Sequence, residues 1–149
     1  MSELATAVGA ILKNKPRQIW SISPAATVSE CLEMMAEKQV GALLVMEQDK
    51  LIGIISERDY ARKVFLLGRT SRETLVAEIM TSPVVTVTPS QTLGDCMHIV
   101  TDKRIRHLPV MDNDKVMGLI SIGDLVNWLI SEQQKTISQL QAYICGTAS

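Results

Sequence analysis

KQVGALLVMEQDKLIGIISERD, residues 38–59, and KRIRHLPVMDNDKVMGLISIGD, residues 103–124, are two versions of one pattern. In each, two apolar runs flank a short polar stretch, EQDK or DNDK, and this order is typical of a β-hairpin. The pattern then continues as Gly, two apolar residues, Ser, two variable residues and Asp. A Ser followed three residues later by an acidic residue is typical of the start of a helix. The chain therefore predicts a hairpin followed by a helix, twice.

The repeat extends beyond these stretches. A shift of 65 positions aligns residues 20–63 with 85–128 without a gap, and 13 of the 44 positions are identical. Each copy begins with an extended stretch, WSIS or VVTV, and a Thr that caps a helix expected over 27–38 or 92–103. Two copies are too few for an open solenoid, so they should pack on each other. The predicted fold class is α/β, more closely α+β: two β-α-β-β-α units packed as a pseudo-twofold pair.

Both ends of the chain predict additional helices. Residues 2–14 place Leu4, Val8, Ile11 and Leu12 on one side, and residues 122–143 form a long apolar stripe. Such stripes usually pack on the chain's own core or on a second subunit. The predicted divisions are an N-terminal helix (1–15), a first unit (16–66), a linker helix (67–79), a second unit (80–130), and a C-terminal helix extension with a tail (131–149).

Composition disfavours several classes of function. The 149 residues carry a net charge of -1 with no block of like charge, and 3% are aromatic, which disfavours nucleic-acid binding. No apolar run is long enough to span a membrane, and the first residues lack the basic start of a secretory signal. The odd set Cys31, Cys96 and Cys145 has no CxxC spacing, so neither a disulfide framework nor a zinc site is indicated. We expect a cytoplasmic protein.

The stretches IMTSPVVTVTP, KRIRHLPVMDNDKVMGLISIGDL and KQVGALLVMEQDKLIGIISERDYARKV resemble the tandem cystathionine-β-synthase (CBS) domain pair, or Bateman module, over roughly residues 16–130. This resemblance implies an adenosine-containing ligand (AMP, ADP, ATP, NAD or S-adenosylmethionine) in clefts between the two copies, and a disc-like homodimer. The first copy departs from the commoner pattern at Gly41, Ala42 and Leu44, where the second has Arg106, His107 and Pro109. Equal use of the two clefts is therefore not implied.

The Ser and Asp of the repeated pattern have two interpretations. They can form capping boxes that begin a helix. Alternatively, the helix start can attract a phosphate while the Asp accepts hydrogen bonds from ribose hydroxyls. The spacing fits both, and the resemblance favours ligand binding. It places Asp59 and Asp124 on ribose, with Ser56 and Ser121 beside phosphate or ribose.

The other residues that the resemblance assigns to the ligand lie in short apolar or basic stretches. The backbone of the apolar stretches would read the adenine edge, and Arg58 and Arg106 would contact phosphate. His107 could instead be a strand residue at a subunit contact, and Trp20 a core residue. The group expected to face Asp59 is Met80, Thr81, Val85, Ile105 and His107, and the group expected to face Asp124 is Trp20, Val40 and Ala42.

Three classes of function follow from these residues. The leading hypothesis is a non-catalytic regulatory module that binds an adenine nucleotide, needs no metal, and acts on an unidentified protein. An enzyme is disfavoured because the chain has only two histidines, no Gly-rich phosphate loop and no metal-ligand cluster. The third is a structural dimer or partner-binding adaptor whose clefts stay empty.

Overall fold

The computed structural model describes residues 3–15 and 18–145, which form two compact bodies. The copy-1 body comprises Gln18–Thr86 and Met111–Gly118. The copy-2 body comprises the described parts of Met1–Arg17, Val87–Val110 and Leu119–Ser149. Each body is built around one copy of the sequence repeat.

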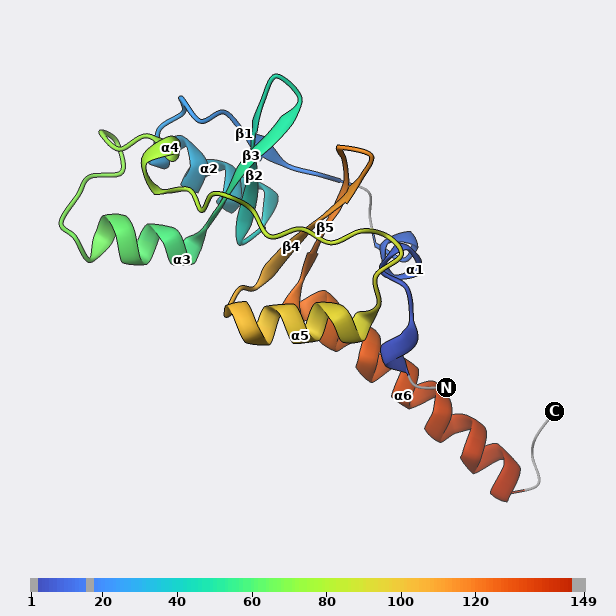
Figure 1. Cartoon of the computed structure of the whole chain (residues 1–149). Helices are drawn as coiled ribbons and strands as arrows, with labels where there is room; N and C mark the ends of the chain where they lie inside the picture. Colours follow the sequence, from blue (N-terminus) through green and yellow to red (C-terminus); the bar gives the residue numbers. More distant parts are fainter. Residues whose placement is uncertain (1–2, 16–17, 146–149) are drawn as a thin grey trace. The chain divides into compact units, whose positions relative to one another are not determined.

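The copy-1 body contains a three-stranded sheet in the order β1-β2-β3 (Figure 1). Strand β1 is parallel to β2, and β2 is antiparallel to β3. Leu43, Val45 and Ile55 point from the sheet into a core shared with the helices. The elements in chain order are β1 (Ser21–Ile22), α2 (Val28–Lys38), β2 (Ala42–Glu47), β3 (Lys50–Ser56), α3 (Glu57–Tyr60), the π-helical η2 (Ala61–Phe65) and α4 (Val76–Ile79).

The second copy has the same succession of helix, hairpin and helix, with a two-stranded sheet of β4 and β5 whose turn end, Met111–Gly118, groups with the copy-1 body. Its core gathers Leu108, Val110 and Ile120 from the strands with residues of the helices. Both bodies thus mix helices with a small sheet, which confirms the α+β prediction. The elements are η1 (Glu3–Ala5), α1 (Val8–Lys13), α5 (Leu93–Lys103), β4 (His107–Asp112), β5 (Lys115–Ser121) and α6 (Ile122–Ile144).

Local sequence signals account for the helix starts and hairpin turns. The Thr27 and Thr92 hydroxyls accept hydrogen bonds from backbone N–H groups three residues later, at 3.2 and 3.1 Å, and so cap α2 and α5 as predicted. Positive φ angles occur at Gln48–Asp49 and at Asn113–Asp114. Two consecutive positive φ values are typical of type I′ turns, whose twist matches antiparallel strands.

The first strand of the second copy differs from the prediction. Leu44 N–H donates to Trp20 O at 3.2 Å and helps to hold β1 beside β2. Pro109 stands at the position equivalent to Leu44 and has no N–H to donate. Val87 still donates to Pro109 O at 3.0 Å, but only an isolated bridge to Val110 remains. The VVTV stretch is therefore not a strand.

The N-terminal helix expected over residues 2–14 is also not continuous; Ser2 lies outside the described residues. Residues 3–5 form the 3-10 helix η1, and α1 begins only at Val8. Between them, Thr6 O accepts the N–H of Leu93 at 2.8 Å, and Ala7 forms a bridge with Thr92. Pairing with the start of α5 requires extended backbone and interrupts the helix. Of the predicted stripe, Val8 and Ile11 are buried, Leu12 is partly buried, and Leu4 is 44% exposed.

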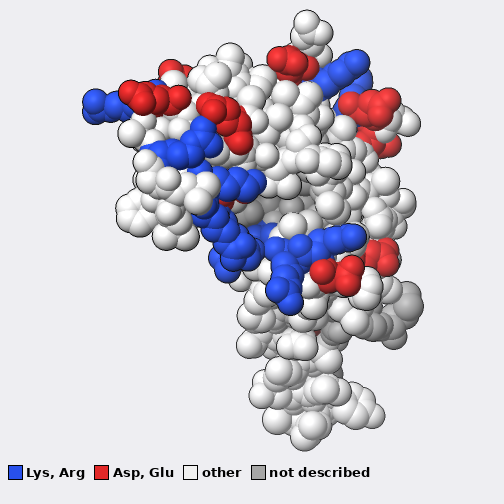
Figure 2. All heavy atoms as spheres, turned by 60° about the vertical axis from the view of Figure 1, so that its left-hand side comes forward, with Lys and Arg blue, Asp and Glu red and all other residues white. Residues whose placement is uncertain are grey.

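Helix α6 is much longer than its counterpart in the copy-1 body. Leu125 is buried in the core, and Trp128 and Leu129 pack against that core. Residues 133–141 are all exposed. The end of α6, lowest in the view of Figure 2, carries no charged side chain after Lys135. The part of α6 after Lys135 therefore presents an uncharged surface.

Candidate functional site

Asp59 forms the predicted capping box with Ser56. Asp59 N–H donates to Ser56 Oγ at 3.3 Å, and Ser56 N–H donates to Asp59 Oδ2 at 2.9 Å. The Ser56 hydroxyl also donates to the same carboxylate oxygen at 3.1 Å. The capping interpretation is thus confirmed, and it uses one of the two carboxylate oxygens.

The second oxygen of Asp59 contacts a different part of the chain. Thr81 Oγ1 donates to Asp59 Oδ1 at 3.2 Å, and Lys63 Nζ lies 3.1 Å from the same oxygen. The Asp59 side chain is only 13% exposed. One carboxylate oxygen therefore begins the helix, while the other faces a hydroxyl and a cation. The capping and ligand interpretations are compatible, because they concern different oxygens.

Met80 and Thr81 are tied to the edge of β3 by backbone hydrogen bonds. Thr81 N–H donates to Ile54 O at 2.8 Å, and Ile54 N–H donates to Thr81 O at 3.1 Å. Beside this bridge, a Cβ on Gly53 would lie 2.5 Å from Met80 Sδ. Glycine at the start of the repeated pattern thus allows Met80 to approach the strand. The structure places Ser56 and Thr81 within hydrogen-bond distance of Asp59, with Met80 beside Gly53 of the same strand.

Asp124 forms the equivalent capping box in the copy-2 body, with a different cation. Ser121 N–H donates to Asp124 Oδ2 at 2.8 Å, and Asp124 N–H donates to Ser121 Oγ at 3.1 Å. Lys15 Nζ lies 2.5 Å from Asp124 Oδ2 and donates to Leu119 O at 2.5 Å. Burial raises the pKa of Asp124, but hydrogen bonds from Lys15 and Ser121 and the Lys15 charge outweigh it, so this pKa lies below its usual value.

The two sites take their cation from different segments of the chain. Lys63, which faces Asp59, lies four residues later on the same helical stretch. Its equivalent 65 positions later is Trp128, which cannot pair with a carboxylate. Lys15, from the segment after α1, supplies the cation at Asp124 instead. Sequence analysis missed Lys15 because the aligned repeat begins only at residue 20.

An internal repeat of the segments that precede each copy, residues 6–14 and 74–82, could have shown that the chain just before Lys15 packs on the second copy. Val76 N–H donates to Ala26 O and Ala77 N–H to Pro24 O, at 2.8 and 3.1 Å. In the copy-2 body, Val8 and Gly9 make the same bonds, at 2.8 and 2.9 Å, with the residues 65 positions after Ala26 and Pro24. The segments 6–14 and 74–82 align at a shift of 68, and they share Thr6/Thr74, Val8/Val76 and Ile11/Ile79.

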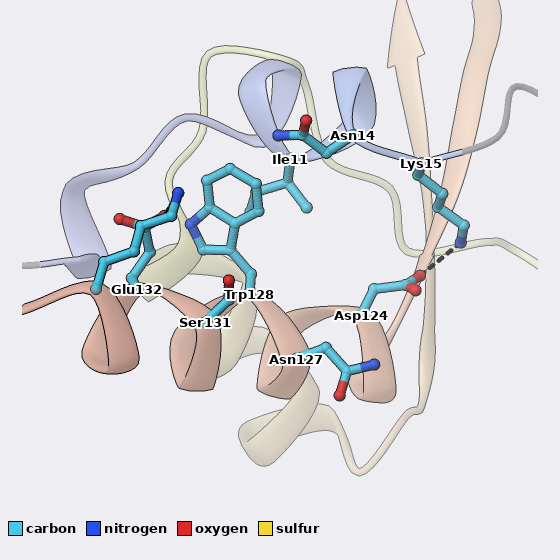
Figure 3. A pocket seen from close by; sticks show the side chains of 9 residues that line it. Ile11, Asn14, Lys15, Asp124, Asn127, Trp128, Ser131 and Glu132 are labelled. Carbon is cyan, nitrogen blue, oxygen red and sulfur yellow. Dashed lines mark hydrogen bonds and ion pairs between the residues drawn. The ribbon is translucent and has the colours of Figure 1, made fainter. Parts of the chain in front are cut away.

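A cavity of about 430 Å³ lies between α1 and α6, beside Asp124 (Figure 3). Its wall includes the Trp128 ring and charged side chains of both signs. These are the cations Lys15 and Lys135 and the carboxylates Asp124 and Glu132. The buried Trp128 Nε1 has no hydrogen-bond partner among the described residues. The cavity wall thus combines an aromatic ring with the Asp124 carboxylate, and in Figure 3 Trp128 Nε1 lies on the side of the ring away from Asp124.

The remaining predicted site residues lie in one body or the other. Trp20 packs against the copy-1 core, with Lys38 Nζ 4.3 Å from its ring centre. Arg58 is half-buried at the start of α3. Contacts of Asp59 with Ile105 and His107, and of Asp124 with Trp20, Val40 and Ala42, would join the two bodies and stay predictions. The copy-1 body holds Trp20, Val40, Ala42, Arg58 and Val85, and the copy-2 body holds Ile105, Arg106 and His107.

Within residues 3–15 and 18–145, no group of three or more His, Cys, Asp or Glu side chains could hold a metal ion. None of the helices described there is long and apolar enough to cross a bilayer. The three cysteines are free thiols, and burial raises the pKa of Cys31 and Cys96 to about 11, with smaller contributions from Asp59 and Asp95 respectively.

Each of the two repeated units has a hairpin followed by a helix that begins with a Ser–Asp capping box, and this arrangement defines the class of tandem CBS-domain proteins. The CBS-domain profile matches residues 9–65 and 76–131. The chain therefore belongs to the CBS-domain family and is a tandem CBS pair.

Individual relatives agree with this class. The chain is 38% identical over 152 residues to CBSX3 of Arabidopsis thaliana, a mitochondrial CBS domain-containing protein, covering 95% of this chain and 73% of that protein. A solved CBS-domain protein of Burkholderia ambifaria is 50% identical with a TM-score of 0.83, covering 86% and 96% of the two chains. The structure of CBSX2 in complex with AMP is 26% identical with a TM-score of 0.70, covering 86% and 98%.

Proposed function

We propose that this chain is a non-catalytic regulatory module that binds an adenosine-containing ligand, AMP, ADP, ATP or NAD, at sites that include Asp59 and Asp124. The observation that carries the proposal is the divided role of Asp59. Its Oδ2 is held by Ser56, whereas Oδ1 faces Thr81 and Lys63. A carboxylate fixed by its cap is well oriented to accept hydrogen bonds from two ribose hydroxyls. The AMP complex of the relative CBSX2 supports this class of ligand.

The other proposed contacts follow the family resemblance. The backbone of Met80, Thr81, Val85 and Ile105 would read adenine at the first site, and Trp20, Val40 and Ala42 would form the wall at the second. Arg58, Arg106 and His107 would contact phosphate, with Ser56 and Ser121 beside phosphate or ribose. Apolar residues can serve here because backbone groups recognise the base edge.

The proposed assembly is a homodimer that acts on an unidentified protein in the cytoplasm, without nucleic acid, membrane or metal. Exposed Phe65, Leu66 and Leu67, at 68%, 71% and 67%, support a subunit contact. Light scattering of the intact chain at micromolar concentration tests the dimer. A monomer under those conditions would contradict it.

The ligand is tested by calorimetric titration with AMP, ADP, ATP, NAD and S-adenosylmethionine, together with mass spectrometry of any nucleotide that co-purifies. Saturable binding of at least one adenosine ligand, without its turnover, is expected. An absence of binding for all five would favour the alternative of a structural dimer or adaptor with empty clefts. Sustained turnover that disappears on mutating a site residue would instead indicate an enzyme.

A further inference from the structure

Helix α6 carries an apolar seam along its exposed side. The seam runs from Val126 to Ile144, and its five apolar residues are spaced by four, seven, three and four positions. These intervals fit the a and d positions of a heptad repeat. Ile130, Ile137 and Ile144 occupy successive a positions, and Gln133 fills the d position inside the gap of seven. The apolar seam residues, 43–79% exposed, are Val126, Ile130, Ile137, Leu140 and Ile144.

The second half of α6 has little support from its own chain. Residues 133–141 are exposed on all sides of the helix. Lys135 forms an ion pair with Glu132 of the same helix, at 3.3 Å. Isolated helices of this length are marginally stable in water, and the β-branched Thr136 and Ile137 lower the helix propensity further. A partner that covers the seam would stabilise this part of α6.

The distribution of charge favours a second copy of the chain as that partner. The positions that flank a coiled-coil seam, e and g, hold only uncharged residues here, so two copies meet without like-charge repulsion. Helices that lie on membranes carry several Lys or Arg residues on the polar face, whereas Lys135 is the single basic residue from 126 to 144. The e residues are Asn127, Gln134 and Gln141, and the g residues are Leu129, Thr136 and Tyr143.

Gln133 distinguishes between the two possible orientations. In a parallel, in-register pair each residue faces its own copy, so the two Gln133 amides can hydrogen-bond with each other. In an antiparallel pair of the same span, Gln133 faces Ile137 and its amide loses that partner in an apolar seam. Ile at a with Leu at d also favours parallel two-stranded coiled coils.

We propose that α6 pairs with α6 of a second copy as a parallel coiled coil over residues 126–144. At about 1.5 Å per residue the contact would be about 28 Å long. Trp128 and Lys135 occupy f positions on the opposite side of the helix, so the pairing leaves the cavity of Figure 3 uncovered. The inference rests on the homodimer proposed above and adds to it a second contact surface, distinct from Phe65–Leu67.

Cysteine pairing tests this surface directly. In a Cys145→Ser background, the remaining native thiols, Cys31 and Cys96, are buried. Leu140→Cys places a thiol in the seam, and Ser138→Cys places one at an outer b position as the matched control. Under mild oxidation at micromolar concentration, the Leu140→Cys chain should become mostly a covalent dimer, at least fivefold more than the Ser138→Cys chain.

Two results would overturn the proposal. One is equal covalent dimer from the Leu140→Cys and Ser138→Cys chains. The other is preferential pairing of Ile130→Cys with Leu140→Cys in a mixture of two chains of different tag length, because that contact exists only in the antiparallel arrangement. Light scattering of the parent chain distinguishes failure of this proposal from failure of the homodimer proposal. If the parent is a dimer but the Leu140→Cys chain does not form a covalent dimer, the α6 contact is excluded while the homodimer and ligand proposals remain.

Discussion

Lys15 Nζ lies 2.5 Å from Asp124 Oδ2, although 109 residues separate the two in the chain. At the equivalent Asp59 the cation is Lys63, four residues later. The two carboxylates therefore share a capping geometry but depend on different segments for their charge partner. This difference makes their responses to mutation and pH distinguishable.

Lys15→Met should remove the cation from Asp124. Since the folded-state pKa of Asp124 lies below 3.8, its ionised carboxylate stabilises the fold above that pH, and this contribution is lost as the pH falls through the lowered value. The variant should lose about 0–1 kcal/mol of unfolding free energy near neutral pH, because the pair is partly exposed, and less once the pH is low enough to protonate Asp124. Urea unfolding at several pH values measures this. An equal loss at every pH would contradict the ion-pair explanation.

Asp59→Asn should separate the cap from the ligand site. Loss of a charge-assisted acceptor for two ribose hydroxyls should weaken nucleotide binding about tenfold to a hundredfold. Loss of the capping interaction should lower the unfolding free energy by at most about 1 kcal/mol. Calorimetric titration and thermal melting on the same variant measure both, with Glu57→Gln as the control for a nearby exposed carboxylate. A variant that melts earlier but binds as tightly as the parent would limit Asp59 to its cap.

Arg58→Ala should weaken binding of AMP more than binding of adenosine, if Arg58 contacts phosphate. The difference between the two ligands should shrink in high salt, because the charge of the half-buried Arg58 is partly screened by ions. Titration of both ligands at two salt concentrations measures this. Equal losses for adenosine and AMP would remove Arg58 from the phosphate site.

Gly53→Ala should displace Met80, because the new Cβ would lie 2.5 Å from its Sδ. We expect a loss of about 1–3 kcal/mol in unfolding free energy, as for other overpacked positions. Met80→Ala in the same chain should recover part of that loss, which a double-mutant cycle measures. Additive effects of the two substitutions would mean that Met80 does not set the requirement for glycine.

Leu44→Pro and Pro109→Leu test the difference between the first strands. Leu44→Pro removes the hydrogen bond to Trp20 O and should cost about 1–3 kcal/mol of unfolding free energy, since it leaves that carbonyl without its donor. Pro109→Leu supplies an N–H and should be tolerated far better. Chemical unfolding of both variants provides the comparison, and equal losses would contradict the role of Pro109 in shortening the pairing.

Interactions between near neighbours were predictable from the sequence. The Thr caps, the two hairpins and the Ser–Asp boxes join residues within a few positions, so their spacing alone specifies them. The position of Thr81 beside Asp59 came from the family resemblance. No local pattern predicted Lys15 beside Asp124, because that contact depends on how a distant segment packs. The break at Thr6–Ala7 was missed for the same reason, since long-range pairing with α5 overrides helix propensity.

The reciprocal packing of the leading segments has a consequence for how such a chain can arise and be divided. The segment before the second copy completes the first body, and the segment before the first copy completes the second. A fragment cut at the boundary between the copies would carry the leading segment that belongs to the other half. Two separate single-copy chains could reproduce all these contacts only by exchanging their leading segments, as in a domain-swapped dimer. The tandem chain is the covalently joined form of that exchange.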